Sequence, residues 1–258
     1  MDQIPPRPAA TIVVIREQNE MLEILMLRRS SEAASAARAH VFPGGGVDEI
    51  DAEVVRRGLV HGLDESSANR RLDLATGGLT YYCAALRELF EEAGLLLALD
   101  STGRPLDVGG ERLTSWREEL VQGAVSWAQL LEREGLRLAL AEMHYLAHWV
   151  TPEGRPRRFD TRFFLAAAPT RQVAHADGSE IVAHVWTTAP DALARFTAAT
   201  WSMLVPTVHT LRMLSTVPTL DEALRLAATS SVRRIQPREI EREGRTIVVV
   251  PGEAGYED

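Results

Sequence analysis

"YCAALRELFEEAGLL", residues 82–96, is the stretch that decides the fold. Its apolar residues recur with the period of a helix over residues 80–93, and Gly94 follows where a C-terminal cap glycine is typical. The pattern therefore predicts a helix that packs on the protein core. Four residues are expected on its buried face: Tyr82, Cys83, Leu86 and Leu89.

Three glutamates, Glu88, Glu91 and Glu92, interrupt this apolar pattern. At positions i, i+3 and i+4 they share one face of the helix, where like charges repel each other. A hard divalent cation such as Mg²⁺ or Mn²⁺ prefers oxygen ligands and would turn this repulsion into a ligand set. A solvated acidic helix face has the same spacing, so the helix alone leaves both interpretations open.

A glycine-rich segment, "FPGGGVDEID" at residues 42–51, precedes the helix in the chain. Glycines allow the backbone to approach a ligand or a metal closely. A tight turn at the end of a strand would also explain them. The two features together favour a metal site, in which Arg87 could orient one of the carboxylates.

"RELFEEAGL" (residues 87–95) and "FPGG" (residues 42–45) resemble the two ends of the Nudix box. Nudix proteins hydrolyse a diphosphate linked to another group, usually with Mg²⁺ or Mn²⁺. The resemblance implies an α+β fold, an α/β/α sandwich with a mixed sheet and added helices. In the usual box seven residues separate a glutamate from the Arg-Glu pair. Here 35 residues separate Asp51 from Arg87, so residues 52–79 form an insertion.

A long insertion at this point is similar to the branch of peroxisomal and mitochondrial CoA diphosphatases. Further segments resemble that branch in the same order, among them "RRFDTRFFL" at residues 157–165 and "VVVPGEAGYED" at residues 248–258. The resemblance implies hydrolysis of CoA or acyl-CoA to adenosine 3′,5′-bisphosphate and (acyl-)phosphopantetheine. Two alternatives stay open: a diphosphatase for ADP-ribose, an ADP-sugar or NADH, and a non-catalytic Nudix-like module that binds a nucleotide.

The resemblance also implies roles for individual residues. The expected metal ligands are Glu88, Glu91, Glu92, the carbonyl of Gly45 and Asp51, of which Asp51 is a shorter acid than the usual glutamate. The expected catalytic residues are Glu91 as a ligand or base, Arg87 as an orienting group and Glu180 as a further acid from a later loop. An exposed acid at the start of a strand is an equally good interpretation of Glu180.

Arginines are the candidates for binding substrate phosphates, because a guanidinium can form bidentate hydrogen bonds with them. Arg155, Arg157 and Arg158 lie within one short turn, and a solvated hairpin tip is the alternative interpretation of that turn. Arg28 and Arg29 precede the glycine-rich segment and are the other candidates.

Composition limits the class of protein. The chain has 258 residues and a net charge of −8, which argues against nucleic acid or an anionic membrane as a partner. Cys83 is the one cysteine, and no apolar run reaches the roughly 20 residues of a membrane span. Without the pattern of a secretory signal at the N-terminus, we expect a cytoplasmic protein with a small-molecule diphosphate substrate. The oligomeric state stays open, with a homodimer as one outcome.

The remaining pattern predicts the other elements of a single domain over residues 1–258. Strands are expected at residues 10–17, 21–29, 95–99, 143–151, 158–168, 180–188 and 244–253, and a short one enters the glycine-rich loop at 41–51. Helices are expected at residues 114–136, as one or two, and at 189–199, 203–214 and 220–229. Residues 30–40 are predicted as a loop or one weak helical turn, and 52–79 as loop with short polar helices.

Overall fold

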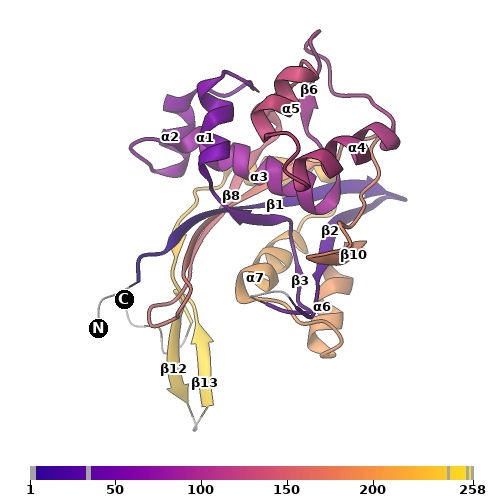
Figure 1. Cartoon of the computed structure of the whole chain (residues 1–258). Coiled ribbons are helices and arrows are strands. Elements are labelled where there is room, and N and C mark those ends of the chain that lie inside the picture. Colours follow the sequence, from indigo (N-terminus) through magenta and orange to yellow (C-terminus); the bar gives the residue numbers. More distant parts are fainter. Residues whose placement is uncertain (1–3, 33–35, 243–244, 254–255, 257–258) are drawn as a thin grey trace.

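The chain folds around a mixed eight-stranded sheet (Figure 1). The computed structural model describes residues 4–32, 36–242, 245–253 and 256. Six strands follow the order β10-β2-β1-β9-β8-β11, while β3 pairs with β2 and β4 pairs with β1. Their bounds are β1 (Arg7–Gln18), β2 (Met21–Arg29), β3 (His40–Val41), β4 (Gly44–Gly46), β8 (His144–Val150), β9 (Phe159–Ala167), β10 (Ile181–Thr188) and β11 (Arg234–Ile235).

Strand β1 shows why the sheet needs a layer on each face. Ile12 and Val14 pack into one hydrophobic cluster and Val13 and Ile15 into the other, and all four are fully buried. Successive side chains of a strand point to opposite faces, so a continuous apolar run is stable only when both faces are covered. The sheet is therefore the middle layer of a sandwich.

Helices supply the two outer layers. One face carries α3 (Gly78–Ala93) and its neighbours, and α6 and α7 lie on the opposite side of the sheet (Figure 1). The bounds of the others are α1 (Glu49–Arg56), α2 (Glu65–Leu72), α4 (Gly110–Val121), α5 (Trp127–Arg133), α6 (Ala189–Thr197), α7 (Val205–Leu214) and α8 (Leu220–Thr229). The predicted α+β class and α/β/α sandwich are confirmed.

Helix α3 has the buried face that its sequence predicts. Its four core residues are fully buried: Tyr82, Cys83, Leu86 and Leu89. The helix ends at Gly94, whose φ of 68° lies in the left-handed region that favours glycine, and whose N–H donates to the carbonyl of Phe90. It begins at Gly78, two residues before the predicted start, because Glu65 of α2 accepts hydrogen bonds from the N–H groups of Gly77 and Gly78 at 2.6 and 3.2 Å.

The structure corrects two predicted elements. Of the strand predicted at residues 95–99, only β6 (Ala98–Leu99) is a strand, whereas Leu95 and Leu96 are buried without forming one. Strand β6 belongs to a three-stranded sheet with β5 (Val60–His61) and β7 (Arg137–Ala139), and the sequence pattern did not indicate this sheet. Asp51 lies in α1 and not in the glycine-rich loop, because Asp48 and Asp51 form the capping box that starts this helix.

The other predicted elements are found close to their expected bounds. Residues 114–136 lie in two helices, α4 and α5, of which α4 begins earlier than predicted, at Gly110. Residues 30–39 form a loop as far as they are described, His40 belongs to β3, and residues 33–35 lie outside the described residues. The late strand is β13 (Arg245–Val249), and its predicted first residue, 244, also lies outside the described part. Its antiparallel partner β12 (Arg238–Arg242) was not expected.

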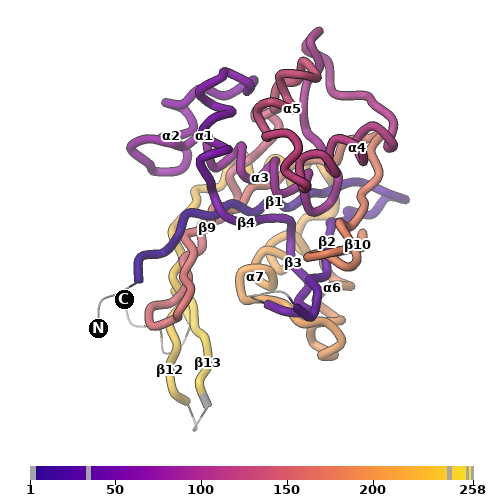
Figure 2. Tube along the Cα trace, in the orientation of Figure 1, coloured from indigo at the N-terminus to yellow at the C-terminus, as the bar shows by residue number. Residues whose placement is uncertain are grey.

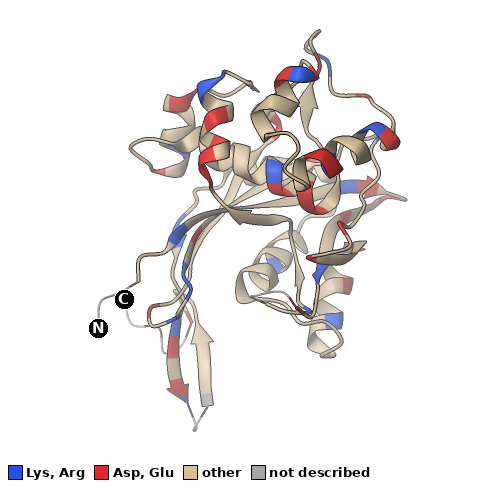
Figure 3. Cartoon of the chain, in the orientation of Figure 1, with Lys and Arg blue, Asp and Glu red and all other residues tan. Residues whose placement is uncertain are grey.

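The β12–β13 hairpin extends away from the main sheet (Figure 2). Acidic residues lie on several elements, including α1, α4, α5 and β12, and are interspersed with basic ones (Figure 3). Among the described residues, no helix is long and apolar enough to cross a membrane.

Candidate active site

The site forms where strands β1 and β2 diverge. They pair with each other only near their shared turn, from Ile15 opposite Ile24 to Gln18 opposite Met21. Beyond that point β2 pairs with β3, and β1 pairs with β4. Residues 40–46 therefore fill the fork between the two strands and bring the glycine-rich segment against α3.

The glycines of β4 lie in direct contact with the glutamates of α3. The N–H of Gly44 donates to a carboxylate oxygen of Glu92 at 2.9 Å. A Cβ added at Gly45 would lie 2.5–2.8 Å from the carboxylate atoms of Glu88, closer than real side chains approach. Residue 45 must therefore be glycine for the Glu88 carboxylate to keep this position.

Arg87 is the centre of the hydrogen-bond network. Its Nε and Nη2 donate to the Asp51 carboxylate at 2.8 and 3.2 Å, and Nη2 also donates to the carbonyl of Gly46 at 2.8 Å. Its Nη1 donates to Glu88 at 2.9 Å and to Glu91 at 3.0 Å. One guanidinium thus links α1, β4 and two of the three glutamates.

Burial sets the protonation of this cluster. It raises the pKa of Glu88 to about 7, although Arg87 acts in the opposite direction. Burial also raises the pKa of Glu91, and it holds the pKa of Glu92 well above its usual range, with the charge of Glu88 adding to the effect. Burial opposes the charge of Arg87, but the hydrogen bond to Asp51 and the surrounding carboxylates raise its pKa. Burial thus favours the neutral form of the three glutamates, and a bound cation would favour the charged form.

The donor set suits a divalent cation. The carboxylates of Glu88, Glu91 and Glu92 lie near the C-terminal end of α3, beside the backbone of Gly44 and Gly45, which have no Cβ. Among the described residues, no three acidic, histidine or cysteine side chains are already arranged as a metal site; Glu88 and Glu91 contact Arg87, and Glu92 contacts Gly44. Carboxylate and carbonyl oxygens are nevertheless the ligands that Mg²⁺ and Mn²⁺ prefer.

Asp51 and Glu180 occupy different places around the cluster. Asp51 is fully buried, and burial raises its pKa while the hydrogen bond from Arg87 lowers it. Its contact with Arg87 places it beside the glutamates, behind the guanidinium. Glu180 is half exposed, at 54% of its side chain, and forms an ion pair with Arg29. Both members of this pair act electrostatically on Glu92, which places them next to the cluster.

The five predicted substrate-binding arginines fall into two groups. Arg28 and Arg29 end β2, at the fork. Arg155 forms an ion pair with Glu239 of β12, and Arg158 donates to the carbonyls of Thr151 and Ile4. Arg157 is exposed in the same turn. The guanidiniums of Arg155 and Arg158 therefore bind other parts of this chain, and Arg29 pairs with Glu180, whereas Arg28 forms no ion pair within the described part of the chain.

Arg117 of α4 belongs to the site but was not predicted. Its Nε donates to the carbonyl of Glu91 at 2.7 Å, and its Nη1 donates to the carbonyl of His175 at 2.8 Å. It thus ties the C-terminal turn of α3 to the segment that precedes β10. Nothing in the sequence around residue 117 indicated this contact.

The fold and this carboxylate-bearing helix define a Nudix hydrolase. The NUDT19 Nudix domain family matches residues 60–214, and the chain belongs to this family. Nudix hydrolases generally use divalent metal ions and act on small-molecule diphosphates.

Two known proteins and one solved structure illustrate what this chain is similar to. Acyl-coenzyme A diphosphatase NUDT19 of Gallus gallus is 28% identical, over 91% of this chain and 72% of its own length. The Homo sapiens protein of the same name is 26% identical, over 79% of this chain and 63% of its own length. The crystal structure of a NUDIX hydrolase from Alicyclobacillus acidocaldarius covers 88% of this chain and 99% of its own, with 29% identity and a TM-score of 0.73.

Proposed function

We propose that this chain hydrolyses the diphosphate of CoA or an acyl-CoA with Mg²⁺ or Mn²⁺. Water adds to one phosphorus atom and the bridging P–O bond breaks, which gives adenosine 3′,5′-bisphosphate and (acyl-)phosphopantetheine. The carrying observation is the intact network of Arg87 with Asp51, Glu88 and Glu91 in a member of the NUDT19 Nudix family. The names of the Gallus gallus and Homo sapiens relatives support CoA as the substrate class.

Each residue of the network has a proposed task. Glu88, Glu92 and the carbonyl of Gly45 would hold the cation, with Glu91 as a further ligand or as the base. Such a cation supplies charge neutralisation for the diphosphate and lowers the pKa of water. Glu91 has the more exposed side chain, 26% against 14% for Glu88, so it is the better placed to accept a proton from attacking water.

The surrounding residues hold these groups in place. Arg87 fixes the carboxylates of Glu88 and Glu91, and Asp51 fixes Arg87. Arg29 lies at the end of β2 and is the candidate for binding the diphosphate, with Glu180 competing for it in the absence of substrate. We expect substrate binding to loosen the Arg29–Glu180 ion pair, which would free Glu180 to act as the further acid.

A panel assay tests the proposal. The purified chain is incubated with CoA, acetyl-CoA, ADP-ribose or NADH in Mg²⁺, in Mn²⁺ or in EDTA, and the products are separated by chromatography. CoA and acetyl-CoA should be hydrolysed with the higher kcat/KM, and EDTA should abolish turnover. Hydrolysis of ADP-ribose or NADH with CoA untouched would overturn the substrate class.

Variants test the assignment of the helix. Glu91→Gln removes the proposed base and should lower kcat about 10²–10⁴-fold. Glu111→Gln, on the first turn of α4, is a matched control because it makes the same change at an exposed glutamate outside the network. Nucleotide binding without turnover of any diphosphate in the wild-type chain would instead indicate a non-catalytic module.

A further inference from the structure

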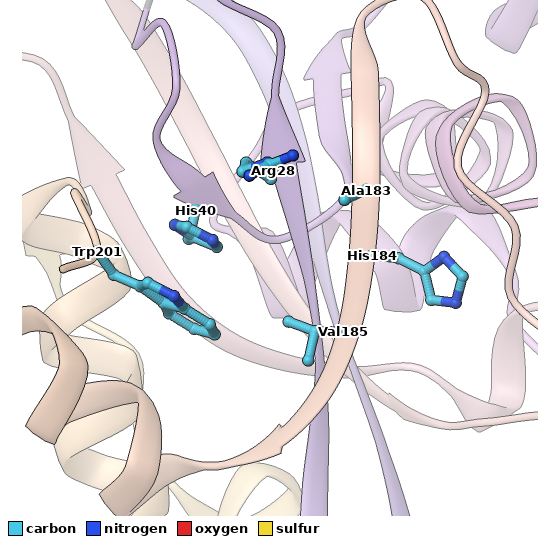
Figure 4. Close-up of a pocket in the computed structure, with 6 residues that line it drawn as sticks. All are labelled: Arg28, His40, Ala183, His184, Val185 and Trp201. Atoms are coloured by element: carbon cyan, nitrogen blue, oxygen red, sulfur yellow. The ribbon is translucent and has the colours of Figure 1, made fainter.

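A small pocket lies beside the fork, on the opposite side of β2 from the glutamates. Arg28 of β2, His40 of β3 and Trp201 line one side of it, and Ala183 and Val185 of β10 line the other. In Figure 4 the Arg28, His40 and Trp201 side chains gather together, while the His184 ring points away from them. Its volume is about 180 Å³, below the roughly 300–1,000 Å³ of pockets for whole drug-sized ligands. It therefore suits one small group of a larger substrate.

The pocket has positive charge without a partner. The guanidiniums of Arg28 and Arg195 form no hydrogen bond or ion pair within the described part of the chain. Both lie close enough to His40 to lower its pKa, to about 4, although burial contributes more. The Arg28 guanidinium and a neutral imidazole therefore line the space, Arg195 lies near His40, and a bound anion would balance these positive charges.

His40 also has a polar atom that lacks a partner. The residue is 9% exposed, and its Nδ1 is buried with no hydrogen-bond partner among the described residues. Burying such an atom without a partner costs free energy, so a ligand group that reached this nitrogen would satisfy it. The backbone N–H of His40 donates to the carbonyl of Ser202 at 2.8 Å, which fixes the ring beside Trp201.

The pocket geometry disfavours a stacked base as the ligand. The His40 ring already stacks on the Trp201 indole, with the centroids 3.9 Å apart and the planes 5° from parallel. The guanidinium of Arg195 lies over the same indole at 5.2 Å. Since the aromatic surface is occupied, the groups left for a ligand are the Arg28 guanidinium and the His40 nitrogen. These are donors for phosphate oxygens.

We propose that this pocket binds a phosphate monoester of the substrate, which in CoA is the 3′-phosphate. The source of the phosphate rests on the proposed function, whereas the site itself rests on Arg28, His40 and the pocket they line. The pocket and the glutamates lie on opposite faces of the sheet, since the side chains of the adjacent residues Arg28 and Arg29 point to opposite faces. Both lie at the same end of β2, because His40 precedes Gly44 by four residues, a span of at most about 14 Å along the chain. A substrate could thus hold its diphosphate at the glutamates and its monoester in the pocket.

Kinetics with two substrates test the proposal. Wild-type protein should hydrolyse CoA with a higher kcat/KM than 3′-dephospho-CoA. Arg28→Ala should lower kcat/KM for CoA about 10–100-fold more than for 3′-dephospho-CoA, the loss expected for a hydrogen bond to a charged group. Arg137→Ala, which removes an exposed arginine of β7, is the matched control and should change neither value. Equal kcat/KM values of the wild type for CoA and 3′-dephospho-CoA would overturn the site. An equal loss of kcat/KM for both substrates in Arg28→Ala would overturn it as well.

A second variant and a binding measurement separate this proposal from the proposed function. His40→Phe keeps a ring on Trp201 but removes the nitrogen, so it should reduce the preference for CoA as Arg28→Ala does. If CoA is not turned over, calorimetry with adenosine 3′,5′-bisphosphate and AMP tests the pocket directly. Arg28→Ala should weaken binding of the bisphosphate more than that of AMP; an unchanged ratio of the two affinities would contradict the site even where CoA hydrolysis fails.

Discussion

Replacing Asp51 with asparagine should destabilise the fold and impair the site together. Asp51 is fully buried and accepts two hydrogen bonds from Arg87 and one from the N–H of Asp48. In Asp51→Asn the amide NH₂ cannot accept a hydrogen bond, so at least one of these donors loses its partner. The change isolates charge and acceptor capacity, because the side chain keeps its shape.

The expected loss of stability is about 2 kcal/mol. Breaking a buried ion pair costs about 3–5 kcal/mol when the remaining charge is left alone. Arg87 keeps Glu88, Glu91 and the carbonyl of Gly46, and the variant no longer buries a carboxylate charge, so the cost should fall below that range. Because Arg87 would be held less firmly, kcat/KM should also fall, by about 10–100-fold as for other groups that orient metal ligands.

Urea unfolding followed by circular dichroism measures the first effect, and CoA hydrolysis measures the second. Asp107→Asn is the control, since Asp107 pairs with Arg171 where both side chains are more than half exposed. Exposed pairs contribute about 0–1 kcal/mol. If the free energy of unfolding of Asp51→Asn lies within about 0.5 kcal/mol of the wild-type value, as expected for this control, Asp51 does not support Arg87.

Three further changes test other contacts. Gly45→Ala should lower CoA turnover at least about tenfold, because its Cβ would meet the Glu88 carboxylate at 2.5 Å. Gly46→Ala is the control and should stay close to wild type, because the nearest neighbour of its Cβ would be 3.8 Å away. Equal activities of the two variants would contradict the contact. Glu65→Ala should lower the free energy of unfolding by about 1 kcal/mol, the usual effect of losing a helix cap. Glu49→Ala is the control, since Glu49 is an exposed glutamate paired with Arg56. Equal melting temperatures of the two variants would argue against the cap. His40 has a pKa of about 4 in the folded chain, below its unfolded value of about 6.5, so acid favours the unfolded state. The free energy of unfolding should therefore fall as the pH drops from about 6.5 to about 4, by at most about 1.4 kcal/mol per pH unit. Urea titrations across this range should show a shallower slope for His40→Phe, and the same slope in both proteins would show that His40 does not cause it.

The sequence was sufficient for the parts of the site that a local pattern encodes. The helical period placed the buried face of α3, and the spacing of Glu88, Glu91 and Glu92 put three carboxylates on one face. These features depend on neighbours within one turn of helix, so tertiary structure adds little to their prediction. The glycine-rich segment was expected to allow close approach to a ligand or metal, and its contacts with Glu92 and Glu88 appear only in the folded chain.

Contacts between distant segments were beyond the sequence. Nothing in the polar run around Glu65 distinguishes a helix-capping carboxylate from a solvated one, and Arg117 resembles any other helical arginine. His40 and Trp201 are far apart in the chain, so their stacking follows only from the pairing of β3 with β2 and the course of the α6–α7 connection. The apolar run at residues 95–99 failed as a strand for a related reason: short buried runs have no period that separates a strand from buried loop.

The insertion takes on a structural meaning when its two flanks are considered together. Asp51, immediately before residues 52–79, holds Arg87 in the middle of α3. Glu65, inside the insertion, caps the first turn of the same helix through Gly77 and Gly78. A long loop costs little closure entropy by itself, so the added residues need not destabilise the fold. Since Glu65 of the insertion contacts α3 at its start, we infer that residues 52–79 form part of one domain with the rest of the chain. On this view the insertion and its flanking residue Asp51 take the place of the short connection of the usual Nudix box: Glu65 caps the helix that carries the glutamates, and Asp51 holds Arg87 of that helix. Cutting out residues 52–79 should loosen the start of α3 even though no proposed metal ligand would be removed.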